Sequence, residues 1–118
     1  MVITEIEIAR GDVVLIRPDT VVGREQRGVR PAIVVQNNEG NEFSPITVVV
    51  PLTDAKEKKK YTFMAMVKEG DGGIKKDSYA LANQIRVIDK SRIIENWGHL
   101  SNETILDIDA ALRDELSL

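Results

Sequence analysis

Residues 31–52 read PAIVVQNNEGNEFSPITVVVPL, and this stretch contains the strongest indication of the fold. Two runs rich in β-branched residues, 31–36 and 46–52, are typical of buried strands. The residues between them, 37–45, are dense in Asn, Gly, Ser and Pro, a composition that predicts a turn. The stretch therefore predicts two core strands separated by a turn.

Further short segments on either side extend this β pattern. Residues 12–16 (DVVLI) predict a buried strand, and residues 61–67 (YTFMAMV) predict another. Residues 78–88 predict a strand that bends near Asn83, and residues 1–8 alternate in a way that indicates an edge strand or an ordered arm. Between them we expect loops at 18–29 and 55–60, a turn at the GDGG of residues 70–73 and one helical turn at 89–94.

The end of the chain predicts a helix over about residues 102–116. Ser101 is suited to cap its first turn, where Glu103 also favours the helix dipole. An apolar stripe recurs at spacings of three and four residues: Ile105, Ile108, Leu112 and Leu116. Several short strands followed by one helix predict a mostly β fold, a small and mainly antiparallel barrel with the helix closing one side.

The length and composition fit one folded domain, residues 1–118. A chain of this size buries about two thirds of its surface, and its 42% hydrophobic and 30% charged residues exclude a disordered chain. The absence of cysteine excludes a disulfide framework, a thiolate zinc site and a thiol nucleophile. The single histidine, His99, is interpreted as a partly buried structural residue just before the helix. We expect no metal site and no cofactor.

Neither a membrane segment nor an export signal is expected. The longest apolar run, residues 46–52, is far shorter than the roughly 20 residues that span a bilayer. The first ten residues lack a basic segment followed by an apolar one, so they do not resemble a signal peptide. The cytoplasm is therefore the expected location.

Charge is unevenly distributed along the chain. The net charge of −3 excludes a globally basic nucleic-acid binder, but residues 10–30 hold five arginines against three acids. Residues 101–118 hold one base against five acids. Arginines in a glycine-flanked loop suit a phosphate, although composition alone favours a solvated loop with ion pairs to Asp19 and Glu25. The lysines of residues 56–60 are interpreted as a solvated loop that can also help to hold a polyanion.

The common nucleotide and metal motifs are absent, and a different set of motifs is present. There is no GxGxxG, P-loop or HExxH, and Asp71 in GDGG lacks the acidic spacing of a calcium loop. In order along the chain stand RGDVV (10–14), VGREQRGVRPAIVVQN (22–37), FSP (43–45), LT (52–53), KDS (76–78) and QIRVIDKSR (84–92). This combination closely resembles the MazF/PemK family of toxin endoribonucleases from bacterial toxin–antitoxin systems.

The resemblance implies both a fold and an activity. The fold would be the small SH3-like β-barrel that this family shares with the related CcdB-like toxins. The protein would be a homodimer that cuts single-stranded RNA at short motifs without metal, leaving a 2′,3′-cyclic phosphate and a 5′-hydroxyl. A cognate antitoxin with an acidic, flexible tail would cover the RNA groove and hold the activity in check.

Two residues match the catalytic positions of the family, Arg30 in the GxRP turn and Thr53 at the end of the next core strand. A fixed guanidinium stabilises the negative charge that develops on a phosphate in the transition state. A threonine hydroxyl can donate to the same phosphate and align the attack. Without the resemblance, Arg30 could pair with an acid and Thr53 could cap a turn. The general base is left open, with Glu25 as one candidate.

Further residues are candidates for binding the substrate. The resemblance places Arg24, Glu25, Gln26 and Arg27 in a loop over the RNA, and Ser44 in a structural corner beside the groove. Some members carry an acid where this chain has Asn83; here Asn83 and Gln84 can read base edges with their amides.

Two alternatives without cleavage are left open, and the departure at Asn83 motivates the second. One is a toxin-fold protein that binds DNA gyrase, because the same barrel serves that class of toxin. The other is a degenerate member that binds RNA or an antitoxin and does not cut. In the ribonuclease interpretation, the acidic C-terminal segment would suppress non-specific RNA binding.

Overall fold

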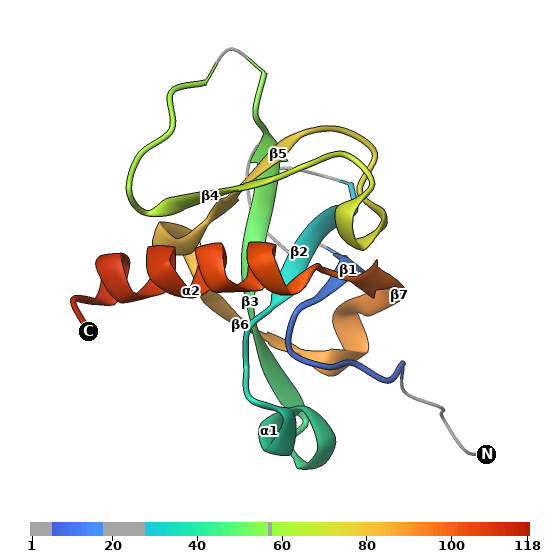
Figure 1. Cartoon of the computed structure of the whole chain (residues 1–118). Coiled ribbons are helices and arrows are strands. Elements are labelled where there is room, and N and C mark those ends of the chain that lie inside the picture. The colour runs from blue at the N-terminus through green and yellow to red at the C-terminus, as the bar shows by residue number, and fades with distance from the viewer. Residues whose placement is uncertain (1–5, 18–27, 57) are drawn as a thin grey trace, which may run out of the picture.

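A computed structural model describes residues 6–17, 28–56 and 58–118 (Figure 1). Within these residues the chain forms seven strands and two α-helices. The strands are β1 (Asp12–Ile16), β2 (Arg30–Val34), β3 (Ile46–Asp54), β4 (Met64–Val67), β5 (Ser78–Leu81), β6 (Arg86–Asp89) and β7 (Ile93–His99). The helices are α1 (Asn38–Phe43) and α2 (Asn102–Leu116), with short 3-10 turns η1 (Asp71–Gly73), η2 (Ala82–Gln84) and η3 (Lys90–Arg92).

The strands form one antiparallel sheet in the order β4-β5-β3-β2-β1-β7, and β6 pairs with β3. The long strand β3 organises it. Its first half pairs with β6, its last three residues pair with β5, and its other edge pairs with β2. Sharing β3 between two partners curls the sheet into a barrel-like shape that is not closed (Figure 1). The predicted mostly β fold with a C-terminal helix is confirmed.

Apolar clusters lie on both faces of this sheet. One contains Val13, Ile33 and Val50 together with Ile108 and Leu112 of α2. Adjacent residues of the same strands enter the second cluster on the opposite face, which holds Val14, Ile16, Ala32, Val34, Val49, Ile88 and Ile93. Successive side chains of a strand point to opposite faces. The continuous β-branched runs in the sequence therefore reflect strands that are buried on both sides.

The helix α2 has the predicted boundaries and lies across the sheet, where it contacts β4 and η2 (Figure 1). The Ser101 hydroxyl accepts a hydrogen bond from the backbone N–H of Thr104, so the predicted cap is confirmed. Ile108 and Leu112 of the predicted stripe are buried, but Leu116 is half exposed because the helix extends past the sheet.

The turn at Asp71 also has a structural role. Its carboxylate accepts hydrogen bonds from the Ser101 backbone, the Ser101 hydroxyl and the Thr104 hydroxyl, at 2.8, 3.0 and 2.6 Å. Burial raises the pKa of Asp71, but these hydrogen bonds outweigh burial and hold its pKa below the ordinary value. The residue predicted as part of a turn therefore also anchors the start of α2.

The expectation of a turn over residues 37–45 is wrong, because these residues form α1. The Asn37 side chain accepts a hydrogen bond from the Gly40 N–H and so starts the helix. Gly40 serves close packing: a Cβ there would lie 2.8 Å from the amide of Gln36. That amide donates to the Ile46 carbonyl and so joins the two sides of the connection.

The N-terminal residues take one of their two expected forms, and the strand β7 differs from expectation. Residues 6–8 form no strand, and Ile8 packs on the core as part of an ordered arm, while residues 1–5 lie outside the described residues. No strand was expected at β7, yet it pairs with β1 through two register shifts. Such irregularities break the alternation of side chains that marks a strand in a sequence. The predicted bend near Asn83 and the helical turn near residue 90 are confirmed as η2 and η3.

No helix among the described residues is long and apolar enough to cross a membrane.

Candidate active site

Arg30 and Thr53 lie side by side at one end of the sheet. Arg30 begins β2 and Thr53 is next to the last residue of β3. The antiparallel register pairs Ala32 with Pro51, and continuing it by two residues places Arg30 opposite Thr53. Both residues line one pocket of about 540 Å³. The fold therefore brings together two residues that are 23 positions apart in the sequence.

The rest of this pocket comes from the ends of β2, β3 and β5. Leu52 and Ser78 are buried and form its base, while Gly28, Val29 and Lys76 are exposed at its rim. Pro31 and Asp54 complete the lining. An open pocket with an exposed arginine in its lining is accessible to a large anionic ligand.

Positive charge dominates the pocket and its margin. The Lys76 ammonium lies 3.1 Å from an Asp54 oxygen, and the Lys58 ammonium donates a 3.0 Å hydrogen bond to the Thr53 hydroxyl oxygen. With Arg30, the described residues of the site include three cations and one carboxylate, that of Asp54. Such an arrangement suits a phosphodiester.

Asp54 is held in its ionised form. A hydrogen bond from the Lys56 backbone N–H, at 2.9 Å, is the largest influence and lowers the pKa of Asp54. The Lys76 side chain lowers it further. At neutral pH the Asp54 carboxylate therefore keeps its charge and its pairing with Lys76.

The Thr53 hydroxyl has a defined direction. Because its oxygen accepts from Lys58, its own proton is available to donate to a further acceptor. Two hydrogen bonds hold the Lys58 backbone in place. Its N–H donates to the Ala55 carbonyl, and its carbonyl accepts from the Tyr79 hydroxyl. Thr53 is thus suited to donate a hydrogen bond to an anion in the pocket.

The other candidate residues lie elsewhere or outside the described residues. The candidates outside the described residues are Arg24, Glu25, Gln26 and Arg27. Ser44 follows α1 at the far end of β3, where its hydroxyl accepts from the Ile46 N–H. Asn83 and Gln84 are exposed on η2, which contacts β3 and α2, and they do not line the pocket.

Four residues near the pocket were not singled out as site residues from the sequence: Asp54, Lys58, Lys76 and Ser78. Lys76 and Ser78 belong to the KDS motif, and Lys58 belongs to the lysine-rich segment. Nothing in the sequence distinguishes Asp54 except its position after Thr53.

His99 and Asp12 form a separate cluster between β1 and β7. The His99 Nδ1 atom lies 2.8 Å from an Asp12 oxygen, and Asp12 also accepts from the Asn96 amide and the Ala9 N–H. The ring of His99 is exposed at the last position of β7, so it is less buried than expected. No group of three or more potential metal ligands occurs in the part of the chain that the structure describes.

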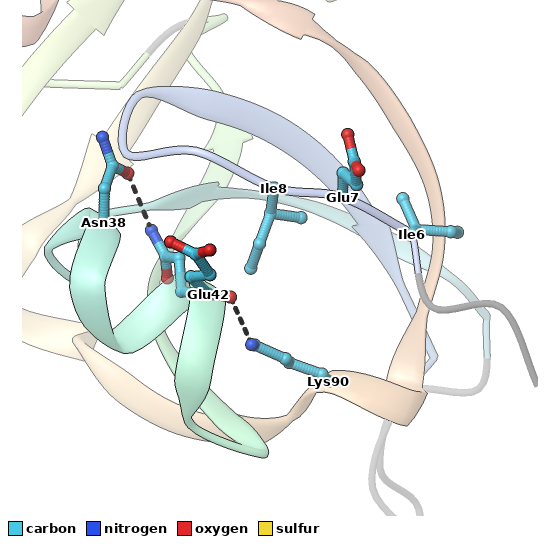
Figure 2. Close-up of a pocket in the computed structure, with 7 residues that line it drawn as sticks. Ile6, Glu7, Ile8, Asn38, Glu42 and Lys90 are labelled. Carbon is cyan, nitrogen blue, oxygen red and sulfur yellow. Dashed lines mark hydrogen bonds between the residues drawn. The ribbon is translucent and has the colours of Figure 1, made fainter.

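A second pocket of about 400 Å³ lies between the N-terminal arm and α1 (Figure 2). Figure 2 shows Lys90 reaching toward α1, and its ammonium donates to the backbone carbonyl of Asn41. Lys90 is buried, so this hydrogen bond compensates for removing its charge from water. Glu7 and Glu42 at the margin make this pocket less suited to an anion than the pocket of Arg30.

A comparison of the sequence with protein families identifies the chain. The family model described as "PemK-like, MazF-like toxin of type II toxin-antitoxin system" matches residues 9–116. The chain belongs to this family. The resemblance seen in the motifs is thereby confirmed.

Two relatives of this MazF/PemK family member agree with the family assignment. The chain is 40% identical to "Endoribonuclease EndoA" of Bacillus subtilis (strain 168), over 94% of this chain and 96% of the relative. It is 39% identical to "Endoribonuclease MazF" of Staphylococcus epidermidis, over 94% and 92%.

Solved structures of the family share the fold. A MazE-MazF crystal structure from Deinococcus radiodurans superposes with a TM-score of 0.79 at 22% identity, over 97% of this chain and 99% of the other. An endoribonuclease in complex with its cognate antitoxin, from a mycobacterial species, superposes at 0.78 and 22% identity, over 94% and 96%. The barrel-like sheet with its terminal helix is therefore the fold of this toxin family.

Proposed function

We propose that this chain is an endoribonuclease toxin that cuts single-stranded RNA at a short sequence motif and is neutralised by a cognate antitoxin. The observation that carries the proposal is that Arg30 of β2 and Thr53 of β3 line one pocket, with Lys76 beside them. Two relatives at about 40% identity over most of the chain are named endoribonucleases.

The proposed chemistry is an internal transfer of the phosphate. The ribose 2′-oxygen forms a bond to the adjacent phosphorus while the bond from phosphorus to the 5′-oxygen breaks. The 2′-hydroxyl loses its proton to a base and the 5′-oxygen gains one, which gives a 2′,3′-cyclic phosphate and a 5′-hydroxyl. The scheme uses no metal and no cofactor.

Arg30 and Thr53 are assigned to the phosphate in this scheme. Negative charge grows on the non-bridging oxygens, and the Arg30 guanidinium stabilises this charge more in the transition state than in the ground state. The Thr53 hydroxyl donates to the same group. Within residues 6–17, 28–56 and 58–118 no ion pair engages Arg30, and the Thr53 hydroxyl oxygen accepts from the Lys58 side chain.

Lys58, Lys76 and Asp54 support these two residues. The two lysines add positive charge where the phosphate would lie. The lowered pKa of Asp54 makes its carboxylate a weak proton acceptor, so we assign it to holding Lys76 and not to the role of general base.

The remaining candidates are assigned to the flanking nucleotides. Residues Arg24, Glu25, Gln26 and Arg27 precede Gly28, which lies at the rim of the pocket, so their segment joins the site there. Asn83 and Gln84 are exposed and offer amides to base edges, and Ser44 borders the far end of β3.

We also propose that two copies assemble, in the cytoplasm, and bind an antitoxin. An apolar patch formed by Phe43, Ile46 and Val87 is 77%, 40% and 57% exposed, respectively, beside strand β6. A second copy that covers this patch would remove it from water. The related MazE-MazF and endoribonuclease–antitoxin structures support a partner of the antitoxin class.

The test is to incubate the purified protein with a long single-stranded RNA in EDTA and to map the fragment ends. We expect discrete cuts that end in a cyclic phosphate, and at least a 100-fold loss of rate in Arg30→Ala. Arg113→Ala, which removes an exposed arginine of α2, is the matched control and should cut normally.

A folded wild type that makes no cuts would contradict the proposal. A supercoiling assay and an RNA-binding assay would then separate the gyrase-directed alternative from the degenerate one.

A further inference from the structure

We propose that Tyr61 and Phe63, together with Lys59, form a stacking subsite for an RNA base outside the cleavage pocket. The inference rests on the proposed ribonuclease function and adds a specificity element to it. The segment lies in the connection between β3 and β4, which projects from the sheet in Figure 1.

The two aromatic rings form an ordered, parallel pair. Their centroids are 5.4 Å apart and their planes differ by 2°. The chain contains only five aromatic residues, and Tyr61 is 48% exposed. An exposed ring that is already held parallel by a second ring can receive a base with little loss of side-chain freedom, and the base takes the place of the Lys59 ammonium that lies over the Tyr61 ring.

Lysines flank this pair along the chain, while Asp107 and Asp114 of α2 line a pocket together with Lys60 and Thr62. The Lys59 ammonium lies 5.3 Å from the Tyr61 ring centroid, and Lys56, Lys58 and Lys60 are exposed neighbours. Proteins bind single-stranded nucleic acid by combining cations for the backbone with aromatic faces for the bases. The lysines and rings of residues 56–63 provide both.

The subsite is physically linked to the proposed catalytic residues. The Lys58 ammonium contacts the Thr53 hydroxyl, and its backbone is held by Tyr79, whose own strand pairs with Thr53. Three residues of chain span at most about 11 Å, so Tyr61 lies close to Lys58. The Tyr61 backbone carbonyl accepts from the Met64 N–H, which fixes its position at the start of β4. An RNA strand held at Thr53 can therefore place a neighbouring nucleotide on Tyr61.

The alternative explanation is that Tyr61 only covers the half-buried Phe63. In that case the loss of the Tyr61 ring would lower the stability of the fold, and its effect on cleavage would not depend on the length of the RNA. A different outcome is that this segment binds an acidic antitoxin tail, for which the lysines alone would be enough.

The experiment compares two RNAs that contain a cleavage site mapped with the long RNA. One is a short oligonucleotide limited to the motif, and the other extends it by several nucleotides on each side. The variant Tyr61→Leu keeps apolar bulk and removes the aromatic face, Tyr61→Phe restores the ring, and Leu106→Ala removes an exposed apolar residue of α2 as a control.

We expect Tyr61→Leu to raise KM for the extended RNA about five-fold or more with little change in kcat. Tyr61→Phe should recover most of this loss, and the difference should vanish on the short RNA. An abasic nucleotide at the stacked position should weaken binding to the wild type and not to Tyr61→Leu.

Three results would overturn the inference. The first is that Tyr61→Leu affects both RNAs equally. The second is that it lowers Tm without changing KM. The third is that it weakens binding of an acidic peptide and leaves KM for RNA unchanged. If the wild type cuts neither RNA, the proposed function fails, and fluorescence anisotropy of the labelled extended RNA still decides whether Tyr61 contributes to binding.

Discussion

The hydrogen bond between Lys58 and Thr53 determines which way the threonine hydroxyl can act. An isolated hydroxyl donates or accepts with equal ease, but one that accepts from an ammonium group has its proton left for another partner. In the proposed reaction that partner is the phosphate. Lys58 therefore acts both as a cation and through the orientation of Thr53.

We predict that Thr53→Val, which keeps the shape and removes the hydroxyl, lowers kcat about 10- to 100-fold. Lys58→Met should lower kcat less, and its effect should shrink in the Thr53→Val background because the two residues act through one contact. Single-turnover RNA cleavage by the two single variants and the double variant measures this coupling. Additive losses would show that Lys58 does not act through Thr53.

At the scale of elements, two polar contacts hold α2 against the sheet. Asp71 anchors the start of the helix through Ser101 and Thr104. Further along, Arg10 donates to Asp109 of α2 at 2.7 Å and to the Val35 carbonyl at 2.9 Å. The RGDV motif thus includes an arginine that joins the helix to the end of β2.

We predict that Asp71→Asn lowers stability by roughly 1 kcal/mol, or about 3–5 °C in Tm near neutral pH. The pKa of Asp71 is held below its ordinary value of about 3.9, so its contribution is full above that value. The contribution is lost as the pH falls through the lowered pKa of the folded state.

Thermal melts between pH 2 and 7 check this prediction. The wild type and Asp71→Asn should converge at the acidic end. Asp77→Asn, which removes another exposed aspartate near the same turn, serves as a comparison. A constant difference between wild type and Asp71→Asn across the pH range would contradict the assignment.

At the scale of the whole molecule, the acids of α2 lie outside the pocket of Arg30, while Asp107 and Asp114 line another pocket with Lys60. The cations gather at the pocket of Arg30, while the exposed acids of α2 do not line it: Glu103, Asp107, Asp114 and Glu115. Asp109 differs from these because it is engaged by Arg10. The idea that an acidic surface suppresses non-specific RNA binding is therefore tested at Asp107 and not at Asp109.

We predict that Asp107→Lys raises affinity for random single-stranded RNA, because local repulsion becomes attraction. The gain should disappear as the salt concentration rises, and cleavage at the motif should change little. Binding titrations at low and high salt measure it, with Asp107→Asn as an intermediate. Unchanged affinity at low salt would show that this surface does not influence RNA binding.

Much of the fold follows from local sequence patterns. The β-branched runs at β1, β2 and β3 and the capped, periodic segment of α2 were predicted with nearly correct bounds. Local patterns failed at α1, whose glycine serves contact with Gln36, and at β7, whose register shifts disturb its alternation. At α1 and at β7, the deciding interactions join residues of the element to residues outside it.

The sequence by itself determined the secondary structure of the strong segments and the family, and it singled out Arg30 and Thr53 as candidates, because periodicity and motifs are written in neighbouring residues. Only the tertiary structure decided that these two residues share a pocket with Asp54 and Lys76, and that Lys58 reaches Thr53. The physical reason is the antiparallel pairing of β2, β3 and β5, which brings strand ends together from positions 30, 53 and 78. Such pairing depends on the whole sheet, and no local stretch of the chain encodes it.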